Sequence, residues 1–494
     1  MNKLIKRLAT VSCAALVGVS AFATTACEQE KEIINAYEIA VENGFVGDEQ
    51  AWLESLKGKD GEDAKSPTAN ELYQTAVNEY GFEGSFYDFL KEMFGDTFQD
   101  GLDKVNDTTT IAENMSSVVS ICCAFTKDYK GGYFGGVRTA VTSAAGSGVI
   151  AYLNKDAGNA YIITNYHVIY DATMGISEYI YLYPYGALNG FYTGDSNRDG
   201  YLDNVNEPPG DYSVNGQLDE GDGMKAKFVG GAMDYDIAIL EVQGGEFFKK
   251  NVAKAVDFGD SESVAVGEKV YAIGNSNGHG ISTTEGIISV DSESIGMAAT
   301  DGSNREVYYR VLRTDAAINH GNSGGALFNA HGELIGITNA KNVEDETDNM
   351  GYALPITQVK YLLQNIWDNK TTEKAGYVSR AMLGVETVIT SSSTEMKNGK
   401  LNVVESFKIN AFLAAGVASN ANTDEEKCLK VLDEILEISF DGENFIKLTR
   451  RHQISDLLLQ VRKGDTVYLK VLREGAEKTV SILFDKDEFF TVYE

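Results

Sequence analysis

The sequence TDAAINHGNSGG, residues 314–325, places one serine, Ser323, inside a glycine-rich turn. Gly321 precedes the serine and Gly324 and Gly325 follow it, so the backbone there can take conformations that other residues avoid. Such a turn can aim several N–H groups at one point beside a nucleophile, as acyl-transfer chemistry requires. Because glycine turns with a serine are also common without a catalytic role, the chemistry depends on a base and an acid elsewhere in the chain.

A histidine and an aspartate upstream supply both groups. His167, one of five histidines, follows an apolar run at 161–164, and Asp236 directly precedes another at 237–240. Taken singly, a histidine at a strand end and an aspartate in a turn are more often ordinary core or surface residues. Together, their order along the chain (His167, Asp236, Ser323) is that of chymotrypsin-like proteases and differs from that of subtilisins and α/β-hydrolases.

Three further segments match the surroundings of these residues in one family. They are GSGVI at 146–150, YAIGN at 271–275 and GYALP at 351–355. With them, the chain resembles the HtrA/Deg family of trypsin-like serine proteases over about residues 108–370, and more weakly up to the C-terminus. The resemblance implies an acyl-enzyme mechanism and two six-stranded β-barrels with the site between them.

The resemblance also implies a role for each site residue. It assigns the roles of nucleophile, general base and orienting acid to Ser323, His167 and Asp236. The implied oxyanion hole consists of the backbone N–H groups of Gly321 and Ser323, with Asn322 as a further member. His320 stands where the family usually has proline, a difference that bears on the rigidity of the loop.

The pattern of residues 117–360 independently predicts a mostly β fold. Short runs rich in Val, Ile, Tyr and Thr alternate with Gly, Asn and Asp, which is typical of an all-β sandwich or barrel. A helix is expected over 356–367. The expected strands are 117–125, 147–153, 160–165, 178–183, 237–242, 269–274, 286–290, 307–314 and 334–338.

A long insertion at about 186–225 departs from the family and contains a candidate calcium loop. Oxygen-bearing residues at loop positions 1, 3, 5 and 9, with glycine at position 6, fit a loop of the EF-hand type. The candidate ligands are Asp195, Asn197, Asp199 and Asp203 with the carbonyl of Tyr201. Position 12 is Asn206 instead of glutamate, and no clear helices flank the loop, so a solvated acidic loop is the alternative. The predicted hydrolysis itself requires no cofactor.

Residues 376–494 are expected to form a PDZ-like α/β domain, with another kind of small α/β module as the alternative. The segment MLGV at 382–385 resembles the carboxylate-binding loop of PDZ domains, although Met382 stands where glycine is usual. The resemblance implies that Leu383, Gly384 and Val385 bind a peptide C-terminus, which adds as a strand. Further expected elements are a strand at 431–438, a helix at 454–461 and a hairpin at 464–475.

The N-terminus predicts secretion and a lipid anchor. Residues 1–26 combine basic residues with an apolar run, as in a signal peptide. Cys27 follows Thr-Thr-Ala, which resembles a lipobox and predicts a lipidated cysteine at the outer face of the membrane; a plain signal peptide is the alternative. Residues 27–107 hold two copies of a short helical repeat, which we interpret as a stalk.

Composition and length limit the alternatives. The chain carries 42 Lys and Arg against 73 Asp and Glu, a net charge of −31 that argues against nucleic acid as a partner. At 494 residues it is expected to hold more than one domain. The predicted organisation is a signal peptide at 1–26, a stalk at 27–107, a protease domain at 108–370 and a PDZ-like domain at 376–494.

The predicted function is that of a membrane-anchored serine endopeptidase that cleaves unfolded or damaged extracytoplasmic proteins. Expected partners are unfolded protein or peptide substrates, peptide C-termini and the membrane, and the resemblance implies a homotrimer, which the unusual stalk leaves open. The segments expected to wall the specificity pocket, 317–318 and 339–341, lack acidic residues, which favours small or medium aliphatic residues at the cleavage site. An inactive or latent peptide-binding or chaperone protein of the same fold is the alternative. The native substrates and the activating signal are not readable from the sequence.

Overall fold

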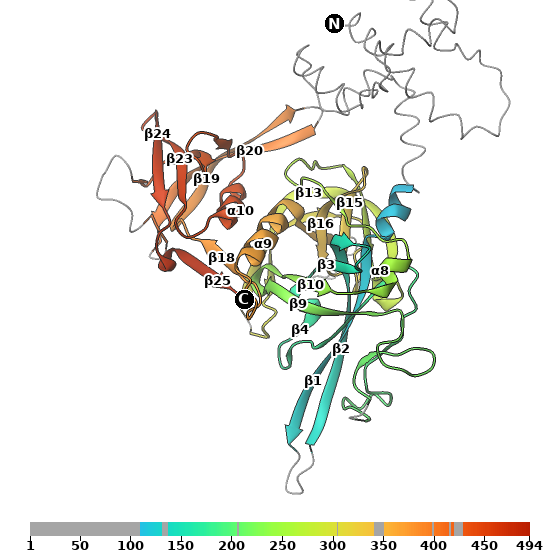
Figure 1. The fold of residues 1–494 in the computed structure, drawn as a ribbon. Coiled ribbons are helices and arrows are strands. Elements are labelled where there is room, and N and C mark those ends of the chain that lie inside the picture. Colours follow the sequence, from blue (N-terminus) through green and yellow to red (C-terminus); the bar gives the residue numbers. More distant parts are fainter. Residues whose placement is uncertain are drawn as a thin grey trace, which may run out of the picture. The chain divides into compact units, whose positions relative to one another are not determined.

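The structure is a computed structural model that describes residues 109–130, 137–204, 207–303, 305–339, 350–397, 400–413, 416–418 and 428–494. These residues belong to one compact unit, Thr108–Glu494 (Figure 1). The predicted signal peptide, Cys27 and the predicted stalk lie outside the described residues, so their predictions stay predictions. Among the described residues, no helix has both the length and the apolar character that crossing a lipid bilayer requires.

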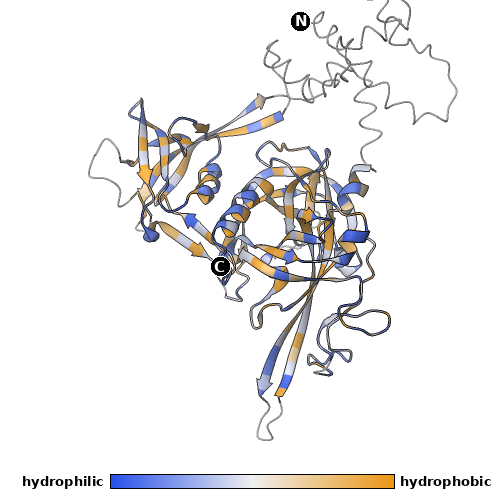
Figure 2. Cartoon of the chain, viewed as in Figure 1, coloured by the Kyte–Doolittle hydropathy of each residue, from blue (hydrophilic) through white to orange (hydrophobic). Residues whose placement is uncertain are grey.

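Six strands close the first barrel. Their order is β1 (Val118–Lys130), β2 (Val137–Asn154), β3 (Asn159–Thr164), β10 (Ile237–Val242), β9 (Met224–Ala232) and β6 (Tyr179–Pro184). Branched apolar side chains from these strands fill the interior, where their burial removes apolar surface from water. Fully buried members of this core include Ile121, Ile150, Ile162, Leu182 and Leu240. The barrel strands are correspondingly rich in hydrophobic residues (Figure 2).

The strands β1 and β2 are much longer than the apolar pattern predicts. They stay paired from Val118↔Val149 out to Lys130↔Val137, and their outer halves run away from the rest of the barrel (Figure 1). These outer halves are mostly exposed and polar, so they lack the buried face that gives a strand its sequence pattern.

The insertion at 186–225 packs onto the first barrel. It contains the short pair β7 (Phe191–Tyr192) and β8 (Gly210–Asp211), and two backbone bonds tie it to β2: Val141 N to Gly200 O at 2.9 Å and Leu202 N to Thr139 O at 2.9 Å. The fully buried carboxylate of Asp211 accepts hydrogen bonds from the hydroxyl of Tyr183 and the backbone of Gly223. A buried charge is tolerated when it is hydrogen-bonded in this way.

A second ring of strands follows. The sheet order is β11 (Asp257–Phe258), β16 (Glu333–Asn339), β15 (Ala326–Asn329), β12 (Lys269–Gly274), β13 (Ser282–Ala298), β14 (Glu306–Thr314) and β17 (Gly351–Pro355). Because β16 also pairs with β17, the six strands from β16 to β17 close on themselves and leave β11 at the edge. The two six-stranded barrels expected from the sequence are thus present.

The helix α9 (Ile356–Asp368) begins directly after β17 and matches the predicted helix. Its buried residues Ile356, Val359, Leu362 and Ile366 follow helical spacing and join a core that both barrels share. The remaining short elements before α9 are α7 (Tyr166–Ile169), β4 (Tyr170–Asp171), β5 (Gly175–Ile176), η1 (Met233–Tyr235), α8 (Glu246–Lys250) and η2 (Ser276–Gly278); residues 109–115 are also helical.

The C-terminal module is a sheet with one short helix. The sheet order is β19 (Val385–Lys397), β20 (Lys400–Phe412), β21 (Glu434–Ser439), β23 (Thr466–Arg473) and β24 (Ala476–Leu483), with β22 (Ile446–Lys447) beside β21. The other elements are β18 (Val378–Ala381), α10 (His452–Leu457), η3 (Leu458–Gln460), η4 (Asp487–Phe489) and β25 (Phe490–Tyr493), and β18 pairs with β25.

The predicted start of one strand in this module is wrong. The strand expected at 431–438 begins only at Glu434. Leu432 has a φ of 73°, in the left-handed region, and the Asp433 carboxylate accepts the backbone N–H of Lys430, so these residues form a turn.

Candidate active site

His167 lies on the single-turn helix α7, directly after β3. Its neighbours Tyr166, Val168 and Ile169 are buried in the first barrel and anchor the turn. The imidazole is left 21% exposed, so one face of it remains accessible to a substrate. The apolar run of β3 thus positions a histidine at the rim of the barrel.

Asp236 holds this histidine from the start of β10. Its side chain is fully buried and its φ of 52° is left-handed, a conformation that aspartate tolerates better than most residues. One carboxylate oxygen accepts the backbone N–H of His167 at 2.9 Å, and the other lies 2.7 Å from Nδ1 of the imidazole. A carboxylate can only accept, so the proton sits on Nδ1 and Nε2 keeps a lone pair to act as a base.

Two asparagines that the sequence reasoning did not assign to this cluster complete it. Asn339, the last residue of β16, donates from its side chain to the Asp236 carboxylate at 3.0 Å. Asn165 donates to the Asp236 carbonyl at 2.9 Å. Because Asn339 belongs to the second barrel, the acid is fixed by both barrels. Burial, together with the nearby Asp236 carboxylate, also raises the pKa of the Tyr309 hydroxyl.

The loop between β14 and β15 carries Ser323, which is 5% exposed. Gly321 and Gly324 have φ values of 90° and 81°, where glycine is favoured. A Cβ at Gly321 would overlap the Asn275 carbonyl oxygen, and one at Gly324 would overlap the Ser147 carbonyl oxygen. The glycines flanking the serine are therefore required both by conformation and by space.

Backbone and hydroxyl bonds fasten this loop to the first barrel. Ser147 N donates to the Ser323 carbonyl at 2.8 Å, and the Ser147 hydroxyl donates to the Gly321 carbonyl at 2.7 Å. A Cβ at Gly146 would lie 2.6 Å from the Val168 side chain and 3.2 Å from the Ser323 carbonyl oxygen. Ser323 is thus separated from the helix of His167 by one glycine backbone. The structure brings all three predicted residues to one place between the barrels.

One of the predicted oxyanion donors, the N–H of Asn322, is already hydrogen-bonded within the loop. The N–H of Asn322 donates to the Asn319 carbonyl at 3.0 Å, so in this conformation it is used within the loop. The Asn322 carbonyl accepts the Thr338 hydroxyl at 2.6 Å, which fixes the peptide unit before the serine. Gly321 and Ser323 are the other two predicted donors. The backbone carbonyl of His320 accepts Asn277 N at 2.7 Å and ties the loop to η2.

Known proteins match this chain over the same region. The family described as "Trypsin-like peptidase domain" matches residues 146–337, which span the three residues. "Serine protease Do-like HtrA" of Bacillus subtilis (strain 168) is 30% identical over 349 residues, 70% of this chain and 64% of the relative. "Serine protease Do-like HtrB" of the same strain is 32% identical, over 69% of this chain and 62% of the relative. The chain therefore contains a trypsin-like peptidase domain and is homologous to the HtrA serine proteases.

Two further comparisons describe the extent of the likeness. "Periplasmic serine endoprotease DegP" of Escherichia coli (strain K12) is 33% identical over 51% of this chain and 40% of the relative. The solved structure "HtrA-type protease AlgW with decapeptide" has 20% identity and a TM-score of 0.42, and covers 78% of this chain and 98% of that one. The chain spans a little under two thirds of the length of the two Bacillus HtrA relatives that it matches.

The loop that resembles a carboxylate-binding loop lies at the start of β19. The carbonyls of Met382, Leu383 and Gly384 accept hydrogen bonds from backbone N–H groups of the segment 413–418, each at 2.9 Å. In a peptide unit the N–H points opposite to the carbonyl, so the N–H groups of Leu383, Gly384 and Val385 face the other way. These residues line a cavity of about 510 Å³ that is bounded by β19 and α10 and, on the protease side, by residues of β13, β14 and α9.

The candidate calcium ligands Asp195, Asn197, Asp199 and Asp203 are linked by hydrogen bonds within the loop. The Asp195 carboxylate accepts the backbone N–H groups of Asp199 and Gly200, and the Asp203 carboxylate accepts Ser196 and Asn197. Tyr201 bridges to β2 and its ring contacts the guanidinium of Arg138. Within the described part of the chain, the group of His, Cys, Asp and Glu close enough to share one ion lies elsewhere.

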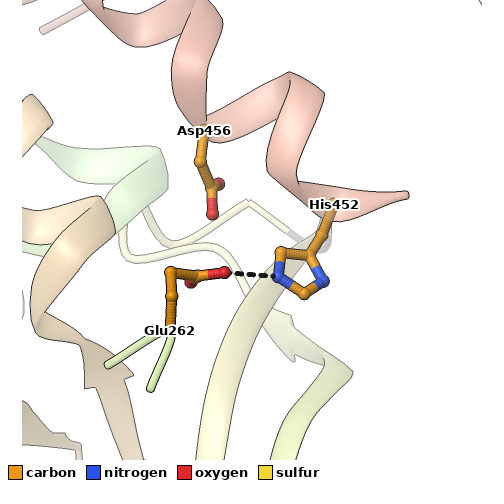
Figure 3. Close-up of side chains that lie close together, drawn as sticks. All are labelled: Glu262, His452 and Asp456. Atoms are coloured by element: carbon orange, nitrogen blue, oxygen red, sulfur yellow. Dashed lines mark hydrogen bonds and ion pairs between the residues drawn. The ribbon is translucent and has the colours of Figure 1, made fainter. Parts of the chain in front are cut away.

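That group is Glu262, His452 and Asp456, which join the second barrel to α10 (Figure 3). A cation is already present: Arg310 lies 2.7 Å from Glu262 and 3.2 Å from Asp456. Burial opposes ionisation of Glu262, but the contacts with His452 and Arg310 outweigh it and hold the pKa of this carboxyl well below its usual range. Burial raises the pKa of the Asp456 carboxyl. We interpret the cluster as an ion-pair network, in which the positive charge of Arg310 neutralises the two carboxylates that could otherwise bind a metal ion.

Replacing Arg310 with glutamine is expected to destabilise the protein by roughly 3 kcal/mol, because the buried Asp456 and the partly exposed Glu262 lose their shared cation. Calorimetry should show an unfolding midpoint that is lower by several degrees. Arg305→Gln is the matched control, since Arg305 pairs with Asp234 while about half exposed and is expected to contribute under about 1 kcal/mol. Equal midpoints for the two variants would contradict the network.

Proposed function

We propose that this protein is a serine endopeptidase that cleaves unfolded or damaged extracytoplasmic proteins through an acyl-enzyme. The observation that carries the proposal is the Asp236–His167 pair, held at 2.7 Å beside the glycine-flanked Ser323. Homology to the HtrA serine proteases supports the same reaction. The relatives' names describe serine proteases, and one is described as periplasmic.

In the proposed reaction each group has one task. Nε2 of His167 takes the hydroxyl proton as the Ser323 oxygen attacks the substrate carbonyl carbon, and Asp236 stabilises the imidazolium that results. The N–H groups of Gly321 and Ser323 stabilise the oxyanion that forms. When the C–N bond breaks, His167 returns the proton to the leaving amine. Water then attacks the acyl-enzyme by the same route and releases Ser323.

A latent resting state forms part of the proposal. Asn322 N is engaged by Asn319, so full formation of the oxyanion site requires the loop 319–322 to rearrange if Asn322 is a donor. A peptide bound at the C-terminal module would then serve as the activating signal. The residues expected to shape cleavage specificity include Ala340 and Lys341, which lie outside the described residues.

The experiment that tests the function is digestion of casein by the purified protein, compared with a Ser323→Ala variant. Digestion by the first protein alone supports the proposal. Negligible digestion by both, with and without added peptides that end in a free carboxylate, would instead favour the alternative of a non-hydrolytic chaperone. Digestion that appears only with such peptides would identify a latent protease.

We further propose that the C-terminal module is a PDZ-like domain that binds peptide C-termini. What supports this is the shared orientation of the N–H groups of Leu383, Gly384 and Val385 toward the cavity, with β19 at an edge of its sheet. An edge strand can accept a peptide as an additional strand. Arg380 also lines this cavity, and its buried Nε has no hydrogen-bond partner among the described residues, so it suits a carboxylate.

Three proposals concern placement and assembly. Lipidation of Cys27 would anchor the chain at the outer face of the cell membrane, with residues 27–107 as a stalk. A homotrimer is proposed from the family resemblance alone. Labelling with radioactive palmitate, lost in Cys27→Ser, tests the anchor, and mass measurement in solution tests the trimer.

Calcium binding at 195–203 also remains a proposal, supported by the spacing of Asp195, Asn197, Asp199 and Asp203. Asp195 accepts only two backbone N–H groups, whereas Asp203 accepts four donors from Tyr192, Ser196 and Asn197, so an ion would have to displace donors at Asp203. Calorimetric titration with calcium is expected to release heat and to raise the unfolding midpoint. The absence of both effects, in a protein whose Asp195→Asn variant behaves identically, would contradict the site.

A further inference from the structure

Arg451, the residue before α10, reaches across the proposed peptide groove. Its guanidinium donates to the backbone carbonyl of Thr387 on β19 at 3.3 Å. Both residues line the cavity of about 510 Å³ that begins at the Leu383–Val385 loop. β19 pairs with β20 on its other side, and among the described residues no strand pairs with it on this one. The Thr387 carbonyl therefore faces the edge to which a peptide would add.

Arg451 differs from its neighbours in the partner of its side chain. Arg450 lies 3.1 Å from Asp291, and Arg310 is paired with Glu262 and Asp456. Glu405, on the neighbouring strand β20, accepts the backbone N–H of Arg451 at 2.8 Å. Within the described residues, the guanidinium of Arg451 forms no ion pair, and its acceptor is a neutral carbonyl. It is also exposed, so it can move.

The geometry of strand addition fixes which peptide residue meets Arg451. A peptide whose final carboxylate lies at the N–H groups of Leu383–Val385 must run along β19 in the opposite direction, away from the loop. The residue opposite Thr387, two positions beyond Val385, is then the third from the peptide's end. Its backbone N–H needs the Thr387 carbonyl, so binding displaces Arg451 and leaves a guanidinium beside that residue's side chain.

We propose that Arg451 makes the groove selective for peptides with an acidic side chain at the third residue from the C-terminus. This inference rests on the proposed peptide-binding role of the module. An aspartate or glutamate there gives the displaced guanidinium a charge-assisted acceptor in place of the carbonyl it loses. A glutamine offers a weaker acceptor, and a lysine is repelled. Arg451 thereby identifies the partner class as acidic peptide tails, and the bond to Thr387 is the contact that other tails must break without compensation.

Binding of three labelled decapeptides tests this proposal. They are identical, end in valine with a free carboxylate, and carry Glu, Gln or Lys at the third residue from the end. Fluorescence anisotropy with the full chain, carrying Ser323→Ala to prevent cleavage, is expected to show about tenfold tighter binding of the Glu peptide than of the Gln peptide. The Lys peptide should bind most weakly. The preference should decrease as salt is added, since the pair is exposed.

Two variants separate Arg451 from general charge effects. In Arg451→Gln, the Glu and Gln peptides are expected to bind within twofold of each other, and the Gln peptide at least as tightly as to the parent protein. Lys478→Gln removes the same charge from β24, at the opposite edge of the sheet, and should keep the tenfold preference. A preference that persists in Arg451→Gln, or equal binding of both peptides by the parent protein, would overturn the inference.

An amidated form of the Glu peptide separates the peptide-binding role of the module from the selectivity of Arg451. If amidation abolishes binding while the charge of the third residue has no effect, the groove binds C-termini and only the role of Arg451 fails. If amidation changes nothing, or no peptide binds, the peptide-binding role proposed for the module fails and the selectivity fails with it.

Discussion

Replacing Ser323 with alanine is expected to lower kcat for hydrolysis of an unfolded protein by about 10⁵–10⁶-fold. Without the hydroxyl no acyl-enzyme forms, and the remaining oxyanion donors supply only a small residual rate. The side chain is 5% exposed and loses a single oxygen, so the fold should persist. Release of fluorescent fragments from labelled casein measures the rate, and calorimetry checks that the unfolding midpoint stays within a few degrees.

A serine outside the site provides the control. Ser303 lies in an exposed turn, where its hydroxyl contacts Asp301, and Ser303→Ala should leave the rate within twofold. A fluorophosphonate, which labels an activated serine covalently, should modify the parent protein once and the Ser323→Ala variant not at all. Labelling of the variant, or undiminished casein digestion by it, would show that another residue is the nucleophile.

Strands buried on both faces were the most predictable part of the fold. The predicted bounds of β10 and β12, 237–242 and 269–274, coincide with those in the structure. Each is a short, nearly continuous apolar run between polar residues, and burial dictates such a sequence. The same reason explains α9, whose apolar residues follow a helical period.

Strands that are stabilised mainly by backbone hydrogen bonds to a neighbouring strand were poorly predicted. The outer parts of β1 and β2, most of β13, and the long hairpin of β19 and β20 carry polar and apolar residues without a strong alternation. Backbone bonds to a neighbouring strand stabilise them, and those bonds leave little trace in the choice of side chain. The sequence accordingly predicted a strand at 286–290 where β13 spans Ser282–Ala298.

The residues of the site likewise include some that local sequence predicts and some that it does not. His167, Asp236 and Ser323 were predictable because each sits in a characteristic local sequence and their order is characteristic of one class of protease. Asn339 and Ser147 were not, because their contacts join residues more than 100 positions apart through single hydrogen bonds. No local pattern requires an asparagine at the end of β16. Its bond to Asp236 depends on the packing of β16 beside the start of β10.

Replacing Asp236 with asparagine is expected to lower kcat by about 10⁴-fold with little change in KM. Asparagine tolerates the left-handed φ of 52° and has the same shape, so the chain should fold. The side chain then has one oxygen for the donors His167 N and Asn339, and its amide group donates toward Nδ1 of His167. The imidazole is driven to carry its proton on Nε2, where it can no longer accept one from Ser323.

Two comparisons make this outcome specific. Asp234→Asn removes a carboxylate two residues away that pairs with Arg305 at the surface, and it should leave kcat within twofold. Asn339→Ala keeps the carboxylate and the imidazole tautomer but removes one donor to Asp236, so its loss should be far smaller, roughly tenfold, and should appear in kcat. Nitrogen-15 NMR of the imidazole reports the tautomer directly: the proton should lie on Nδ1 in the parent protein and in Asn339→Ala, and on Nε2 in Asp236→Asn. An Asp236→Asn protein that keeps the Nδ1 tautomer, or loses less than tenfold in kcat, would mean that the buried carboxylate is a structural anchor for the two barrels and does not orient the base.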